Sequence, residues 1–484
     1  MRRITSSLFL ACLCLALPAY AHHIKQSDQK TMPLTTSSAK ARDLYERAMT
    51  DYENLYLERA TIGWRASAKE DPNFAVAWAW VAFNSRDPQE VVASREKAKA
   101  TAEHASPGER LMVKWIANVE EGNFIVGIAA MNDMLTMFPK DKRLLYLAGN
   151  WLVGENNYEL AQKYFERALA IDKNYPAGLN DLAYAYARNR QYDKAFDAME
   201  RYIALLPSEP NPHDSYAELL RMSGNFDAAL THYRAALKID PDFISSQLGI
   251  ADTYAVMGNE EQARTEYDKA IPRAHNTGDQ FDYSMQKAMT WVREQKFAEA
   301  DKAFQDVAEA AHRQGYALQE AQAHRRMAQY QPDDVLALKY LDAAEAAIWH
   351  DENVTQSDRD EERSRILRYR VVRALHAGQK EVVDQAMFEL ENLATGSRSM
   401  IVQGSYHGAM GAQLFAKGDY AGAISQLEDD ADEPASMELL ARAYAENGAT
   451  DKLHETEAKL RGTNLPTLEQ ALVVPEVRSK RPEF

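Results

Sequence analysis

The chain has 484 residues, a hydrophobic fraction of 46% and a formal net charge of −16 at pH 7. This hydrophobic fraction excludes an intrinsically disordered protein, and the length exceeds what a single compact core normally serves. The negative charge makes nucleic acid and anionic lipid poor partners.

The pattern of the first 21 residues predicts a secretory signal. Arg2 and Arg3 form a charged region, an apolar run follows, and Ala-Tyr-Ala at 19–21 has the small-x-small pattern of a cleavage site. We therefore expect a mature chain that begins at His22 in the periplasm or outside the cell. No later stretch approaches 18 apolar residues, so no integral membrane span is expected.

Both cysteines, Cys12 and Cys14, lie within this signal, so the mature chain is expected to carry neither disulfides nor thiolate chemistry. Acylation of either cysteine would make a lipoprotein, but the apolar run continues past both. His22 and His23 could offer an amine and imidazoles to copper or zinc. Adjacent histidines near a cleavage site are usually plain polar residues, and we expect no metal and no cofactor.

Residues 22–40 read as a flexible N-terminal lead. The stretch is polar, contains Pro33 and a Thr-Thr-Ser-Ser run, and ends at Ser38, which is suited to cap a helix.

A 34-residue period follows. Small residues recur at this interval, each near the start of a predicted helix: Ala161, Ala195, Ala229 and Ala263. Four positions later come large side chains: Phe165, Met199, Tyr233 and Tyr267. Since positions i and i+4 share a helix face, each unit presents a stripe in which a small residue lets a neighbouring helix approach and a large one fills the space beside it.

The segment from Glu109 to Ile271 resembles five consecutive tetratricopeptide repeat (TPR) units. The resemblance implies an all-α fold, a TPR-type α-solenoid of stacked antiparallel helix pairs in a right-handed superhelix. The alternative is a generic helical bundle in which alanines recur at this interval by chance. Several positions of the repeat recur together every 34 residues, which argues against that alternative.

The same patterns divide the mature chain. A TPR array is expected over 41–275, ending at a polar boundary where the period is lost. Divergent TPR-like helical repeats follow over 276–464, with a polar stretch at 351–362 that we interpret as a long loop rather than a hinge. Three prolines and a short basic cluster predict a loosely ordered C-terminal tail over 465–484.

The resemblance also implies a binding surface, because the first helix of each TPR unit lines the concave side of the array. The residues expected there to face solvent and contact a protein or peptide partner are Tyr146, Asn150, Asn180, Tyr184, Arg188, Asp214, Glu218, Arg221, Leu248 and Asp252. Asparagines can pair with a peptide backbone, tyrosines offer amphipathic area, and the charges can select a charged partner.

One specialised TPR class grips a C-terminal carboxylate with lysine, asparagine and arginine residues. Asn150 could match one asparagine of that clamp, but Asp181 and Asp214 stand where neutral or basic groups are needed. Two carboxylates would repel a third. We therefore do not expect this clamp here.

Motifs of metalloproteases, serine hydrolases and nucleotide-binding proteins are missing from the sequence. His213, Asp214 and Ser215 bring three triad residue types together, but adjacent helix positions point in different directions. The sequence thus favours a non-catalytic, exported scaffold that binds a protein or peptide, with envelope assembly or secretion as the candidate setting. The alternative is an enzyme or small-ligand-binding protein whose site lies in the divergent C-terminal half.

Overall fold

The computed structural model describes residue 27 and residues 29–479, and every regular element in this part of the chain is a helix. The predicted signal, its two cysteines and the His22-His23 pair lie outside the described residues. Among those described, no helix is long and apolar enough to cross a bilayer.

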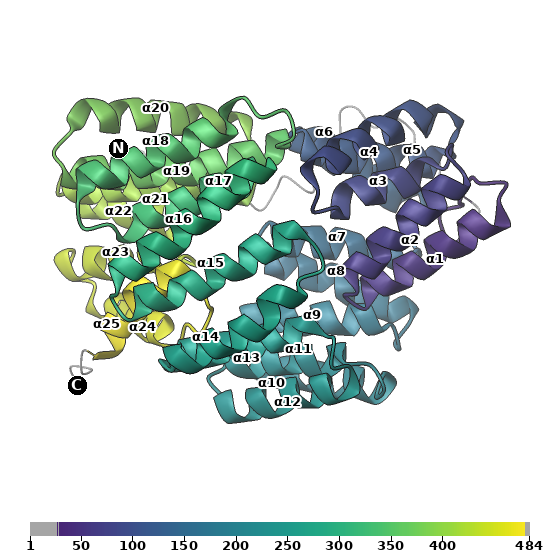
Figure 1. Ribbon diagram of the computed structural model, residues 1–484, viewed down its shortest axis with the longest axis horizontal. Helices are drawn as coiled ribbons and strands as arrows, with labels where there is room; N and C mark the ends of the chain where they lie inside the picture. Colours follow the sequence, from purple (N-terminus) through teal and green to yellow (C-terminus); the bar gives the residue numbers. More distant parts are fainter. Residues whose placement is uncertain (1–26, 28, 480–484) are drawn as a thin grey trace, which may run out of the picture.

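Consecutive helices pair through tight turns, and the pairs stack along the chain (Figure 1). The first seven pairs are α1 (Ala39–Glu53) with α2 (Leu57–Glu70), α3 (Ala75–Asn84) with α4 (Pro88–Thr101), α5 (Pro107–Glu120) with α6 (Phe124–Met137), α7 (Lys142–Gly154) with α8 (Tyr158–Ile171), α9 (Pro176–Arg188) with α10 (Tyr192–Leu205), α11 (Asn211–Met222) with α12 (Phe226–Ile239), and α13 (Ile244–Met257) with α14 (Glu260–Ala270).

The stacking continues past the point where the 34-residue period is lost. The later elements are α15 (Thr277–Arg293) with α16 (Phe297–Gln314), α17 (Ala317–Tyr330) with α18 (Asp334–Trp349), α19 (Gln356–His376) with α20 (Lys380–Gly396), α21 (Met400–Ala416) with α22 (Tyr420–Leu427), α23 (Pro434–Glu446) with α24 (Thr450–Arg461), and a final α25 (Leu468–Ser479). Short 3-10 turns stand at Ala102–His104, Ile271–Arg273 and Glu428–Asp430. The polar stretch at 351–362 is only partly a loop, because α19 begins at Gln356.

The small residues that recur every 34 positions are confirmed as the sites where the second helix of each pair packs against its neighbours. All four alanines of the period have no exposed surface, and they lie on α8, α10, α12 and α14. The aromatic column packs against small residues of the first helices. A methyl group built on Gly249 would come within 2.2 Å of the Tyr233 ring, so glycine is needed where α13 meets α12. The TPR-type α-solenoid predicted from the sequence is therefore the fold observed.

The N-terminal lead is not free where it is described. Residues 29–38 lie along the first helices: the Met32 N–H donates to Asp141 Oδ2 at 2.9 Å, and the Thr35 N–H donates to Glu109 Oε1 at 2.7 Å. Ser38 caps α1 as predicted, accepting from the Ala41 N–H at 3.1 Å. Two carboxylates of the array thus hold a segment that the sequence suggested was flexible.

The C-terminal stretch also departs from expectation, because α25 replaces most of the predicted loose tail. Leu468, Ala471 and Val474 recur at intervals of three residues, and all three are buried against neighbouring helices. Pro475 removes one backbone hydrogen bond but lies on the exposed side of the helix. Prolines that suggested disorder are tolerated here because tertiary packing holds the helix.

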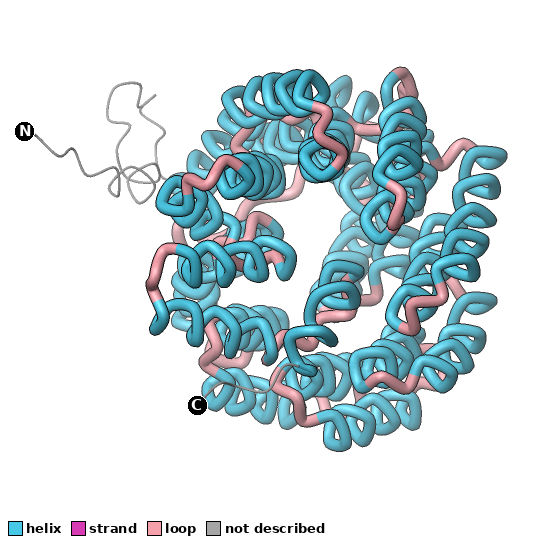
Figure 2. The backbone as a smooth tube through the Cα atoms, turned by 90° about the vertical axis from the view of Figure 1, so that its left-hand side faces the viewer, coloured by secondary structure: helices cyan, strands magenta, loops and turns pink. Residues whose placement is uncertain are grey.

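The stack curves until its two halves touch, and the helices surround a central space (Figure 2). The Met400 N–H donates to Glu155 Oε2 at 2.9 Å, which joins α21 to the α7–α8 turn. Arg190 Nη2 donates to the Lys459 carbonyl at 3.2 Å, which joins the α9–α10 turn to α24. These contacts close the superhelix into a ring-like body with a defined inner side.

One closure contact carries a buried acid. Glu120 on α5 lies near α19, with both carboxylate oxygens buried and without a hydrogen-bond partner among the described residues. The Arg95 guanidinium is 3.7 Å away. Burial raises the pKa of Glu120 to about 8; the Arg95 charge opposes this, and Asp358 on α19 adds to it.

Replacing Ala229 with Leu should destabilise the protein by roughly 1–3 kcal/mol, because the larger side chain overpacks the closest helix contact. The matched control is Ala228→Leu, one residue earlier on α12 and exposed. Thermal unfolding followed by circular dichroism measures both. Equal melting temperatures for the two variants would contradict the repeat register.

Replacing Glu120 with Gln should make stability less dependent on pH. A folded-state pKa above the unfolded value means that wild-type stability is fully present below pH 4.5 and falls as pH rises toward 8. The variant should therefore exceed wild type by at least about 1 kcal/mol at pH 8.5, since one pKa unit is worth about 1.4 kcal/mol. Denaturant melts at pH 5 and pH 8.5 check this; a variant less stable than wild type at pH 8.5 would refute it.

Candidate functional site

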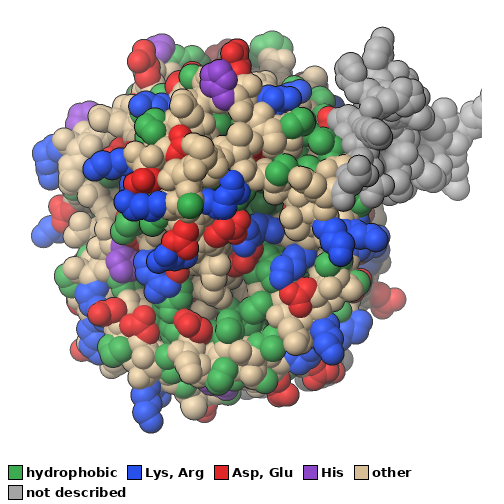
Figure 3. All heavy atoms as spheres, turned by 90° about the vertical axis from the view of Figure 1, so that its right-hand side faces the viewer, with side chains coloured by type: hydrophobic (Ala, Val, Ile, Leu, Met, Phe, Trp, Pro, Cys, Tyr) green, Lys and Arg blue, Asp and Glu red, His purple; other side chains and the backbone are tan. Residues whose placement is uncertain are grey.

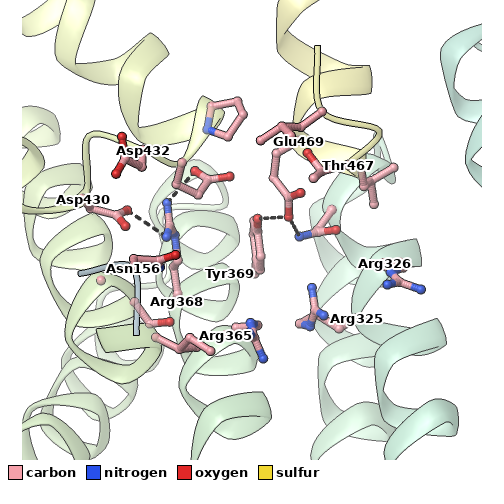
Figure 4. Close-up of a pocket in the computed structure, with 18 of the residues that line it drawn as sticks. Asn156, Arg325, Arg326, Arg365, Arg368, Tyr369, Asp430, Asp432, Thr467 and Glu469 are labelled. Carbon is pink, nitrogen blue, oxygen red and sulfur yellow. Dashed lines mark hydrogen bonds and ion pairs between the residues drawn. The ribbon is translucent and has the colours of Figure 1, made fainter. Parts of the chain in front are cut away.

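A cavity of about 520 Å³ opens on the inner side of the ring. Its walls come from α9, α15, α17, α19, α21, the turn before α23, and residues 465–469. In the view of Figure 4, Arg325 and Arg365 lie at the lower side, while Asp432 and Glu469 lie at the upper side. The cavity wall therefore carries both cationic and anionic groups.

Two arginines of the lower wall share one buried carboxylate. Arg325 Nε on α17 donates to Glu362 Oε1 at 2.6 Å, and Arg365 Nη1 lies 3.7 Å from Glu362 Oε2. Glu362 is 1% exposed and Arg325 is 7% exposed, so this ion pair is almost completely dehydrated. Removing Glu362 would take from Arg325 the only carboxylate with which it forms an ion pair among the described residues.

A third arginine links α19 to the turn before α23. Arg368 Nη1 lies 2.9 Å from Asp430 Oδ2, and its Nη2 lies 2.9 Å from Glu433 Oε2. Gly408 on α21 leaves room for the guanidinium, because a methyl group there would come within 2.7 Å of Arg368 Cζ. Residues of α19, of α21 and of the turn before α23 thus hold this one side chain in place.

Glu469 supplies the main anion of the upper wall. Its Oε1 accepts from Gln329 Nε2 at 2.8 Å and from the Tyr369 hydroxyl at 3.0 Å (Figure 4). Burial alone would raise the pKa of Glu469, but the Arg325 charge and these hydrogen bonds outweigh it, so the pKa lies below the usual glutamate value. The carboxylate is therefore ionised at neutral pH.

Arg326 is held differently from its neighbours. Its Nη1 donates to the thioether of Met285 at 2.8 Å, and no carboxylate of the described residues forms an ion pair with it. Burial, followed by repulsion from Arg325, lowers the pKa of its guanidinium. Arg326 is consequently a half-buried cavity arginine that no ion pair among the described residues compensates.

Of the ten residues predicted to contact a partner, Arg188 lines this cavity, with its guanidinium 5.6 Å from the Tyr158 ring centre. Most of the others belong to neighbouring hydrogen-bonded groups on α7, α9, α11 and α13, which together we term the inner network. In it Asn150 and Asn180 donate to Asp181, and Tyr184 donates to Glu218 Oε2 at 2.7 Å.

Arg221 is the centre of the inner network. It donates to Glu218 Oε1 at 3.0 Å and to Asp252 Oδ2 at 3.2 Å, while Asp214 accepts from the Ser246 hydroxyl at 2.6 Å. Burial raises the pKa of Asp214 to about 7.

The expected solvent exposure is wrong for four of the ten residues, since Tyr146, Asn180, Asp214 and Arg221 are buried. Leu248 is partly buried against the α13–α14 cluster. Successive first helices approach so closely on the inner side that these side chains contact one another. Partner binding by the ten residues stays a prediction.

Sequence reasoning missed the cavity residues of the C-terminal half. One signal was present: Arg365 and Arg368 stand three apart on a helix that is rich in arginine, and Arg325 and Arg326 are adjacent. From the sequence alone, such arginines would be assigned to a solvent-exposed face of a helix. Glu469 lay in what looked like a tail, so nothing placed it beside Tyr369.

Replacing Glu362 with Met should cost about 3–5 kcal/mol, because Arg325 would keep its charge in a dehydrated site. The double change Glu362→Met with Arg325→Met should cost clearly less, since neither charge remains. Urea unfolding followed by circular dichroism compares the two. A double variant less stable than the single one would show that the pair itself, rather than its compensation, supports the fold.

A tetratricopeptide repeat family model matches residues 152–219 and again residues 220–288. These ranges contain the helices on which the 34-residue period was read.

Among curated proteins, subunit cut9 of the anaphase-promoting complex of Schizosaccharomyces pombe is 24% identical over 189 residues, which cover 37% of this chain and 28% of that protein. Superkiller protein 3 of the same organism is 25% identical over 223 residues, 44% of this chain and 16% of that protein. The chain thus spans less than a third of the length of either. The crystal structure of yeast Tom70 aligns at 16% identity with a TM-score of 0.44, covering 85% of this chain and 96% of that one. The repeat-model match and the stacked helix pairs together show that the chain contains tetratricopeptide repeats and has a TPR-type α-solenoid fold.

Proposed function

We propose that the chain is an exported, non-catalytic scaffold that binds a protein or peptide on the inner side of its superhelix and serves envelope assembly or secretion. The observation that carries the proposal is the inner cavity, where Arg188 of the repeat array meets polar side chains of the C-terminal half. TPR arrays mediate protein–protein interactions, and they are usually non-catalytic.

The chemistry of the cavity suits a peptide. Its walls offer guanidinium groups, carboxylates and amides together, and a peptide presents both donors and acceptors along its backbone. A volume of about 520 Å³ holds a few side chains rather than a folded domain. We therefore infer that a short segment of the partner enters the cavity.

Export is supported by the signal-like first 21 residues and agrees with the negative net charge of the chain. On the face formed by the N-terminal helices, basic and acidic side chains are interspersed (Figure 3). Such a surface favours solubility over binding to polyanions.

A second candidate is a small-ligand-binding protein or enzyme with its site in the divergent half. The observation that favours it is that most residues of the cavity wall come from α15 onward. A thermal-shift screen with small metabolites and a broad hydrolase screen address this candidate. A specific melting-temperature increase that Arg368→Gln abolishes would favour it.

The exported mature protein should begin at His22 and carry no lipid. N-terminal sequencing and intact-mass measurement of the protein purified from its native compartment check this outcome. Acylation at Cys12 or Cys14 would replace the soluble form with a lipoprotein.

Partner crosslinks should form at inner positions and not at outer ones. A photoreactive benzoylphenylalanine at Asp432, which lines the cavity with its side chain 70% exposed, should capture the partner in envelope extract. The matched control is Glu299, an exposed residue of α16 outside the cavity wall. Equal capture at Asp432 and Glu299, or capture at neither, would refute binding on the inner side.

A further inference from the structure

The C-terminal segment, residues 462–479, crosses the inner side of the superhelix and touches both halves of the chain. Asn464 Nδ2 donates to the Met222 carbonyl at 3.2 Å, and Leu465 packs against the apolar cluster of α9, α10 and α11. Leu468 is buried in a different cluster, formed by α15, α16 and α17. Residues 464–468 therefore connect surfaces that the helix stack leaves facing the centre.

The segment is attached by one acidic side chain between apolar ones. Leu468 and Leu472 are four residues apart on one face of α25, and both pack against the α15–α17 cluster. Beside them, the Glu469 carboxylate lies between Gln329 of α17 and Tyr369 of α19 (Figure 4). The inner surface of α15, α17 and α19 thus recognises leucines together with a carboxylate.

The fit of this segment is incomplete. The cavity of about 520 Å³ lies directly against residues 465–469 and is open to the inner side of the superhelix, so the segment does not fill the space beside it. Gln329 Oε1 and Gln470 Oε1 are both buried without a hydrogen-bond partner among the described residues. An element that leaves space and unsatisfied acceptors beside it resembles a bound ligand more than a core helix.

We propose that the inner surface of α15, α17 and α19 is a docking site for an acidic, leucine-containing peptide, and that residues 462–479 occupy this site until a partner segment of the same chemistry displaces them. The inference rests on the proposed function and names the ligand class of its inner side. The carboxylate enters a site built from α17 and α19, and not the clamp on the first helices of the array that the sequence argued against.

Tethering explains how the site stays closed without a partner. A covalently linked segment acts at an effective concentration of the order of millimolar, so a free peptide of equal intrinsic affinity competes poorly. A partner must therefore bind more tightly than the segment, or engage the array elsewhere first. Cutting the tether removes this advantage without changing any contact.

The test uses the full chain with a protease site inserted between Gly462 and Thr463, in the exposed turn after α24. After folding and cleavage, a fluorescein-labelled peptide of residues 463–479 is added and its anisotropy measured. The labelled peptide should bind the cleaved protein at least about 100-fold more tightly than the uncleaved protein. A Glu469→Gln peptide should bind about 10-fold more weakly, because a hydrogen-bonded charge is lost.

A Glu476→Gln peptide is the matched control, since it makes the same charge change on the exposed side of α25, away from Gln329 and Tyr369, and the affinity lost by the Glu469→Gln peptide is measured relative to it. Equal affinity of the Glu469→Gln peptide would overturn the carboxylate recognition. Unfolding on cleavage, or failure of excess labelled peptide to exchange with the cleaved segment over days, would show that the segment is structural and would overturn displacement. Crosslinking at Asp432 tests partner binding on the inner side independently of the peptide experiment. The proposed function can therefore hold even if displacement of residues 462–479 is refuted.

Discussion

Close approach of helices at small residues is the constraint from which the architecture follows. Ala161, Ala195, Ala229 and Ala263 have no exposed surface, and each allows a second helix to lie against its neighbours at short range. A pair of helices cannot bury its apolar face alone, so each pair depends on the next. Because the same contact repeats every 34 residues, the curvature repeats as well, and the stack bends until turns far apart in the chain meet.

Closure changes the role of the inner side. In an open array the first helices would present their polar side chains to solvent, as the sequence suggested for Tyr184, Glu218 and Arg221. Here these residues satisfy one another, and Arg221 is 3% exposed between two carboxylates. A dehydrated guanidinium is tolerated only when it is paired and hydrogen-bonded, which accounts for the density of ion pairs along the inner helices.

The local features of the fold could be predicted, and the long-range ones could not. The period, the Ser38 cap and the paired helices follow from residues at most 34 positions apart. The site depends on pairs such as Tyr369 with Glu469, 100 residues apart, and Met222 with Asn464, 242 apart. No periodicity encodes such contacts, and prolines at 466, 475 and 482 pointed to disorder because propensity is a weak prior that tertiary packing overrides. The buried positions of α25 at 468, 471 and 474 were the one local sign of order.

The two polar regions of the inner side differ in the space around them. The inner network of the repeat array is closely packed: its carboxylates accept from neighbouring donors, while Arg221 Nε and Asn180 Oδ1 are buried without a partner among the described residues. The cavity of the C-terminal half instead contains Arg326 without a carboxylate partner, orphaned glutamine oxygens and about 520 Å³ of space. Folding alone would not favour such a site, because each unsatisfied buried group is destabilising. Its persistence beside a segment that already inserts a carboxylate is what makes this wall, rather than the predicted groove, the part of the molecule where binding a partner would gain most.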